Sequence, residues 1–188
     1  VPSVLMKNPK SFNVRRPWPD AKKTGRRLAL AHWLTRSDHP LTARVMVNRI
    51  WKYHFGHGIV KSLGNFGRSG IKPSHPELLD WLSIKFIQSG WDIKALHYLI
   101  MTSNTYKQAS KVSPDMERMD PENILFSRMP LRRMDAEELR DTLFLISGRL
   151  NETPYGPPDI VLERKDGLAT AISSKKGWRR SIYVTQDA

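Results

Sequence analysis

The residues best suited to chemistry in this sequence lie on one predicted helix, over 41–55. Arg44 and Asn48 are four residues apart, so they form a row on the edge of the helix's apolar stripe, while Arg49 points further outward. A guanidinium and an amide placed there can bind a carboxylate, a phosphate or a backbone carbonyl. They suit a structural polar network equally well, for instance an ion pair between Arg44 and Asp80. The sequence leaves both interpretations open.

Three histidines form the second set of candidates. His54, His57 and His75 carry the ligand type that zinc prefers. However, no Asp or Glu lies among them, and Gly56 separates the first two so that their geometry is not fixed. We therefore expect no metal site here, and we interpret these side chains as packing or hydrogen-bonding groups.

Other catalytic machinery is missing from the sequence. There is no cysteine, which excludes disulfides, thiolate catalysis and covalent c-type haem attachment within these residues. There is no nucleophile elbow or phosphate-binding loop. Glu137 and Glu138 are explained by capping of a helix. We expect no catalytic residue and no cofactor within this stretch of chain.

The charge of the chain is concentrated in its first third. The net charge is +13, and residues 1–70 hold 14 Lys and Arg against two acids, a net charge of +12. Such a field attracts an acidic protein surface, an acidic glycan or nucleic acid. Trp178 among basic residues is a weak signal for single-stranded nucleic acid, and no recognised nucleic-acid motif supports it. An acidic neighbouring domain and a free polyanion remain the two main alternatives.

The elements that would position these residues are mostly helical. The chain is predicted to be all-α or nearly so, an irregular helical bundle with long loops and at most one or two short strands. We expect helices over 24–37, 41–55 and 93–103, from Ser74 to Gly90, from Asn104 to Ser110, and from Asp135 through Leu150, with one strand over 181–185.

The helix starts carry recognisable capping residues. Thr24 and Thr42 are predicted N-caps. Ser74 and Glu77 form a predicted capping box, and Asp135 opens a second one. Each of these side chains is expected to accept a backbone N–H of the first helical turn.

The proline-rich residues 1–23 are predicted to form an extended arm or linker, and residues 24–188 to form a single helical domain. The start lacks an initiator Met, so we expect a piece of a longer protein. No stretch approaches the length of a membrane span.

Several ordered blocks resemble a planctomycete-specific domain family of unknown function. The similarity covers roughly residues 24–183. The blocks that carry it are HPLTARVMVNRIWKYHFGHGIV (39–60), SHPELLDWL (74–82), LHYLIMTSNTYKQAS (96–110), RRMDAEELRD (132–141) and RRSIY (179–183).

The resemblance implies an exported origin, periplasmic or at the cell surface, beside a cytochrome-c-like or carbohydrate-related module. Family members continue past the RRSIY block, which implies that the C-terminal part of the domain is missing from this chain. The family supplies no catalytic residues. The positions that carry over its motifs are Arg44, Asn48, Arg49, His54, His75, Asp80, Tyr106, Arg133 and Asp141.

Three functions are compatible with these observations. The leading hypothesis is a non-catalytic docking module for neighbouring domains of the same protein or for an acidic polymer. The second is part of a composite enzyme site for an anionic or carbohydrate substrate, and the third is nucleic-acid binding. The candidate ligand-binding residues are Arg44, Asn48, Arg49, His54, His75, Asp80 and Arg133.

Overall fold

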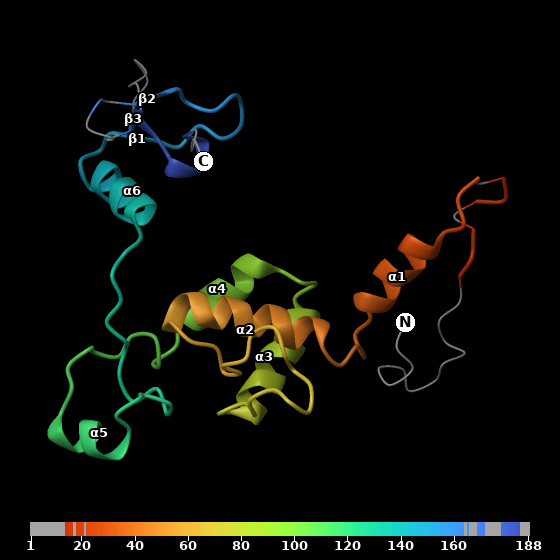
Figure 1. The fold of residues 1–188 in the computed structure, drawn as a ribbon, viewed down its shortest axis with the longest axis horizontal. Helices are drawn as coiled ribbons and strands as arrows, with labels where there is room; N and C mark the ends of the chain where they lie inside the picture. The colour runs from red at the N-terminus through yellow and green to blue at the C-terminus, as the bar shows by residue number, and fades with distance from the viewer. Residues whose placement is uncertain are drawn as a thin grey trace. The chain divides into compact units, whose positions relative to one another are not determined.

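The computed structural model divides the chain into two compact units, Val1–Leu131 and Arg132–Ala188 (Figure 1). Of the predicted arm, only a few residues are described. No helix among the described residues has the length and apolar character needed to cross a membrane. The structure describes residues 14–16, 18–20, 22–163, 165, 169–171 and 178–184.

The described residues of the first unit contain five helices. At its centre α3 contacts both α2 and α4 (Figure 1). Helix α1 precedes them, and the short helix α5 follows. Their bounds are α1 Arg26–Leu34, α2 Thr42–Phe55, α3 Pro76–Gln88, α4 Ile93–Met101 and α5 Pro114–Met119.

One apolar cluster fills the centre of the first unit. Helix α2 contributes the stripe that its sequence spacing predicts, and α3 and α4 each turn one apolar face toward it. The aromatic rings of Trp51 and Phe55 stack, with centroids 4.2 Å apart, and Phe126 meets both rings edge-on. The buried members from the helices are Ala43, Val47, Ile50, Trp51, Phe55, Leu79, Leu82, Phe86, Leu96 and Ile100.

Helix α2 is capped from outside by a histidine. The Nδ1 atom of His39 accepts the backbone N–H of Leu41 at 3.3 Å and that of Thr42 at 3.1 Å. The prediction of Thr42 as N-cap is wrong, because this residue already lies inside the helix and its hydroxyl contacts the same Nδ1 at 2.8 Å. The ring therefore satisfies backbone donors that a cap residue would normally satisfy.

Two other predicted caps are also wrong, while Asp92 is a true cap. Thr24 does not cap α1, whose N-cap position is Gly25. The Ser74 hydroxyl donates to the Ile59 carbonyl at 3.3 Å instead of capping α3. Asp92 accepts the Ala95 N–H at 3.1 Å at the start of α4.

The segment from 120 to 129 is an internally bonded loop. The Asp120 carboxylate accepts the N–H groups of Ile124 at 2.7 Å and Leu125 at 2.8 Å. The Arg128 guanidinium donates to the carbonyls of Asp120 and Pro121. Phe126 projects from this loop into the core.

The second unit contains helix α6 and short strands. Strand β1 pairs with β4 in parallel, and β2 with β3 antiparallel. The expected strand over 181–185 is wrong for its first three residues, because the Tyr183 N–H turns back to the Arg180 carbonyl in a 3-10 helix. The bounds are α6 Ala136–Ile146, β1 Leu150–Asn151, β2 Val161–Glu163, β3 Ala169–Ala171, β4 Trp178–Arg179 and η3 Ser181–Tyr183.

A buried arginine organises the second unit. The Arg179 side chain is 10% exposed. It donates to the Asp159 carboxylate at 3.1 Å and to the carbonyls of Tyr155 at 2.7 Å and Pro157 at 2.5 Å. Its guanidinium also lies over the Tyr183 ring.

The mostly helical class is confirmed. The described residues hold four strands of two or three residues, more than the one or two that the sequence predicts. The short helix predicted from Asn104 to Ser110 is absent, since turns occupy its first four residues. At Asp135 the predicted cap position is correct, but its side chain makes no capping hydrogen bond.

Candidate functional site

The loop between α2 and α3 is fastened to α2 by a buried asparagine. Asn48 is fully buried, and its Nδ2 donates to the Val60 carbonyl at 2.9 Å while its Oδ1 accepts the Val60 N–H at 2.8 Å. Gly58 passes so close that an added Cβ would lie 2.7 Å from Asn48 Nδ2. The side-chain amide therefore satisfies both backbone groups of Val60, as a neighbouring strand would. It also fixes the point at which the loop leaves the core.

Small polar side chains fold the rest of the loop. The Ser62 hydroxyl donates to the Asn65 carbonyl at 2.8 Å and accepts the Ile71 N–H at 2.9 Å. A Cβ added to Gly70 would collide with the Asn65 carbonyl, so the two arms of the loop approach closely there. This turn holds Phe66 and Arg68 on one arm and Ile71 and Lys72 on the other.

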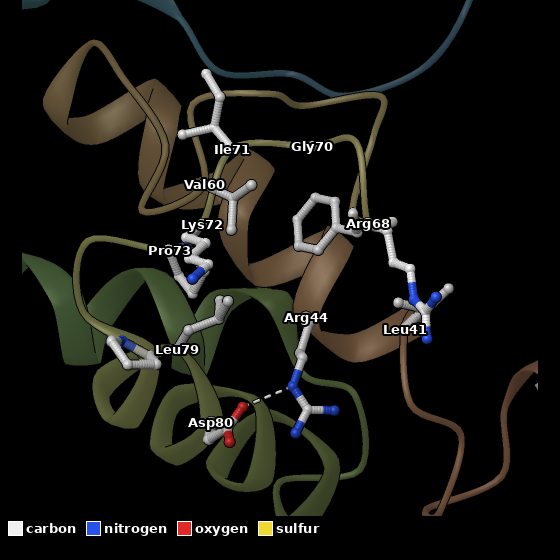
Figure 2. A pocket seen from close by; sticks show the side chains of 13 residues that line it. Leu41, Arg44, Val60, Arg68, Gly70, Ile71, Lys72, Pro73, Leu79 and Asp80 are labelled. Atoms are coloured by element: carbon white, nitrogen blue, oxygen red, sulfur yellow. Dashed lines mark hydrogen bonds and ion pairs between the residues drawn. The ribbon is translucent and has the colours of Figure 1, made fainter.

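The folded loop and the two helices enclose a pocket of about 420 Å³ (Figure 2). Figure 2 shows Arg44 and Asp80 on the helix side and Arg68 and Lys72 on the loop side. A volume of this size is typical of small-ligand sites. The lining residues are Leu41, Arg44, Val60, Phe66, Gly67, Arg68, Gly70, Ile71, Lys72, Pro73, Pro76, Leu79 and Asp80.

Arg44 and Asp80 form the ion pair that the sequence suggested. Arg44 Nε lies 2.6 Å from Asp80 Oδ1, and Arg44 Nη1 donates to the Pro40 carbonyl at 2.6 Å. The two side chains are 36% and 52% exposed, so water screens the pair. Among the described residues Arg44 Nη2 has no hydrogen-bond partner, which leaves donors available to a ligand.

The two cations of the loop, Arg68 and Lys72, have fewer polar contacts than Arg44. Arg68 and Lys72 are both exposed, and within the described part of the chain neither forms an ion pair. Their charge is therefore not neutralised locally, unlike that of Arg44. Together with Arg44 they make the mouth of the pocket a place that attracts anions.

A second hollow of about 330 Å³ lies against the same ion pair. Arg44 and Asp80 line it together with His39 and Ser83. Burial lowers the pKa of His39 below its ordinary value, the Asp38 carboxylate raises it and the Arg36 guanidinium lowers it. A lowered pKa favours the neutral ring, which fits the role of His39 as acceptor of the N–H groups at the start of α2.

The three candidate histidines do not meet at one point. His54 contacts a histidine of α4, whereas His57 and His75 contact the ring of Phe126. His54 Nε2 lies 2.7 Å from His97 Nδ1 on α4. His57 stacks on Phe126 with ring centroids 5.1 Å apart, and His75 lies tilted against the same ring at 5.6 Å. No group of three or more metal-ligating side chains occurs among the described residues.

The sequence matches a protein-family model over most of its length. The family model described as "Protein of unknown function (DUF1553)" matches residues 26–188. The chain belongs to this family. No curated protein and no solved structure matches the chain. The expectation of an uncharacterised domain family is confirmed.

In this DUF1553 domain the predicted site residues do not converge. Only Arg44 and Asp80 reach the pocket, and Asn48 stands behind it with both ends of its amide bonded. His54 and His75 contact other aromatic rings. Arg49 is exposed on α2, and Arg133 is exposed in the second unit.

Most of the residues that line the pocket were not predicted from the sequence, among them one aromatic and two cationic side chains. Phe66, Arg68 and Lys72 lie in a loop without periodicity, so no face of an element gathers them. The available signal was two cations and an aromatic within a few residues of closely spaced glycines. Trp178, weighed as a base-stacking platform, stacks instead on Phe144 with centroids 5.1 Å apart.

Proposed function

We propose that this domain is a non-catalytic docking module that binds an acidic partner through the basic face of its first unit. The observation that carries the proposal is the open pocket bordered by Arg44, Arg68 and Lys72. All three cations belong to the first 72 residues, where the positive charge of the chain is concentrated. Arg68 and Lys72 form no ion pair within the described part of the chain, and such cations at the mouth of a cavity favour an anionic ligand.

Docking is preferred to a composite enzyme site because of how the candidate residues are used. An enzyme built from Arg44, Asn48, Arg49 and His54 would need these side chains around one substrate. The Asn48 amide is instead bonded at both ends to Val60, and Arg49 and His54 do not line the pocket. This leaves binding by charge and shape as the property that the pocket supports best.

The setting of the domain is also a proposal. The resemblance of the motif blocks supports an exported planctomycete protein, with the domain in the periplasm or at the cell surface. It also supports neighbouring domains that include a cytochrome-c-like module. In that setting an acidic neighbouring domain of the same protein is the first partner to test, and an acidic extracellular polymer is the second.

The proposal is tested by salt-dependent binding to an acidic polymer. We expect polyglutamate to bind the chain and to dissociate as ionic strength rises, because exposed charges are screened over about 10 Å at 0.1 M salt. The double variant R68E/K72E is expected to weaken binding at least about tenfold, equivalent to about 1.4 kcal/mol.

A matched control separates the pocket from net charge. R49E/K94E reverses two exposed cations, the same number as R68E/K72E, and neither of them lines the pocket. It is expected to weaken binding only as far as the change in net charge requires. Binding that is insensitive to salt, or equally weakened by the same number of charge reversals elsewhere, would contradict the proposal.

A further inference from the structure

The pocket has an unusual lining for a site that accepts an acidic partner. Its side chains are either apolar or charged, and no neutral polar side chain is among them. A sugar ring placed there would bury hydroxyl groups beside Leu41, Val60 and Leu79. Hydroxyl groups beside these three apolar side chains find no hydrogen-bond partner there, so this part of the lining favours an apolar group.

The apolar part of the lining is continuous with the core. Val60 and Leu79 are buried core residues, whereas Ile71 on the opposite loop arm is 56% exposed. An apolar group in the pocket would therefore contact Val60 and Leu79 on the core side. On the loop side it would shield Ile71 from water. Burial of one bulky aliphatic or aromatic side chain gives such a surface its largest gain in free energy.

The charges are arranged for a chain with both acidic groups and N–H donors. Arg68 and Lys72 stand at the exposed loop side, where they can pair with carboxylates. Asp80 lies on the helix side, and among the described residues its Oδ2 has no hydrogen-bond partner. This carboxylate can accept a backbone N–H, and it repels any anionic group, so the acidic groups of a ligand are favoured at Arg68 and Lys72 and not beside Asp80.

We propose that the pocket binds an acidic peptide segment whose bulky apolar side chain enters the cavity while flanking carboxylates pair with Arg68 and Lys72. The inference rests on the proposed docking function and names its ligand class. An acidic peptide supplies the three features that the pocket requires, namely an apolar side chain, carboxylates and backbone N–H groups.

The test uses two synthetic peptides of equal charge with the full chain. The first has a central leucine with two aspartates on each side, and the second has serine in place of the leucine. We expect the leucine peptide to bind at least about tenfold tighter, since a buried leucine side chain contributes that much or more. Calorimetry at low salt measures both affinities.

Two variants locate the effect. Ile71→Ser removes an exposed apolar wall and is expected to abolish most of the preference for leucine while retaining binding of the serine peptide. R68S/K72S is expected to weaken both peptides. Arg49→Ser, the control outside the pocket, is expected to preserve the leucine preference, and the thermal unfolding of R68S/K72S checks separately that this variant is folded.

The outcomes separate this inference from the docking proposal. Equal binding of the two peptides, or a leucine preference that persists in Ile71→Ser, overturns the peptide inference alone. Tight binding of polygalacturonate that R68S/K72S abolishes, with no binding of either peptide, overturns it in favour of a glycan. Absence of binding to peptides, polyglutamate and polygalacturonate alike overturns the docking proposal as well.

Discussion

Arg44 in the first unit and Arg179 in the second show two uses of the same side chain. Arg179 is 10% exposed and divides its donors among one carboxylate and two carbonyls. Arg44 is 36% exposed, has one carboxylate and one carbonyl, and faces a cavity. An arginine whose nitrogens all donate to protein acceptors fixes the surrounding structure. An arginine with unused donors beside a pocket is instead placed to bind a ligand.

The strongest way to test this contrast is to remove Arg179. Arg179→Met removes the donors that Arg179 supplies to Asp159 and to two carbonyls, and breaking a buried ion pair in this way costs about 4 kcal/mol. Arg179→Lys is expected to restore little, because an ammonium cannot span the same three acceptors. Hydrogen exchange of the amides around 178–184 measures the loss, and unchanged protection there would contradict it.

The next largest loss of stability is expected at Asn48. This side chain lies on the same helix as Arg44, but it is fully buried and bonded at both ends. Asn48→Ala strands the buried N–H and carbonyl of Val60, which is expected to lower the free energy of unfolding by about 3 kcal/mol. Asn65→Ala, an exposed loop asparagine, is the control and is expected to cost less than about 1 kcal/mol. Denaturant unfolding of both variants measures the difference. Similar losses in the free energy of unfolding would show that the two hydrogen bonds between Asn48 and Val60 contribute little.

The histidine that caps α2, His39, makes the stability of the first unit depend on pH. Burial lowers its pKa, so the unfolded chain binds more protons at this position than the folded chain below about pH 6.5. The free energy of unfolding is therefore expected to fall as the pH drops from about 7 to about 5, since a proton on Nδ1 would face the N–H groups of Leu41 and Thr42.

The measurement is denaturant unfolding across this range for the wild type and for His39→Asn, whose amide oxygen can accept the same N–H groups without titrating. The variant is expected to lose part of the pH dependence. An identical pH profile in both proteins would show that His39 does not contribute.

The smallest effect on stability is expected at Arg44. Arg44→Gln removes a half-exposed ion pair, so the free energy of unfolding should change by less than about 1 kcal/mol. The same variant should weaken binding of the acidic leucine peptide, because a donor at the pocket is lost. A large loss of stability would instead place Arg44 with Arg179 as a structural arginine.

The sequence allowed part of this site to be predicted. The spacing placed Arg44 on the edge of an apolar stripe, where an ion pair with an acid such as Asp80 was one of the possible contacts, and the structure contains that pair. The spacing could not indicate Lys72, whose position depends on the Ser62 and Asn65 contacts within the loop. Loop shape arises from such individual hydrogen bonds, which no periodic pattern encodes.

The same limit applies to the second unit. The parallel pairing of β1 with β4 joins Leu150 to Trp178, which no local pattern predicts. Ser181 appeared to start a strand, but its N–H is held by the Asp141 carboxylate at 2.8 Å, and the chain turns there. Helices with a clear apolar stripe, such as α2, were the elements that spacing predicted well.

The loop that carries Phe126 has a consequence for the order in which the chain folds. The hydrogen bonds from Asp120 and Arg128 within it span at most eight residues. Loops this short close quickly and at small entropic cost, so they can form before distant segments meet. Once this loop has formed, the Phe126 ring can pack against Trp51 and Phe55. This packing completes the aromatic cluster and costs little further backbone entropy.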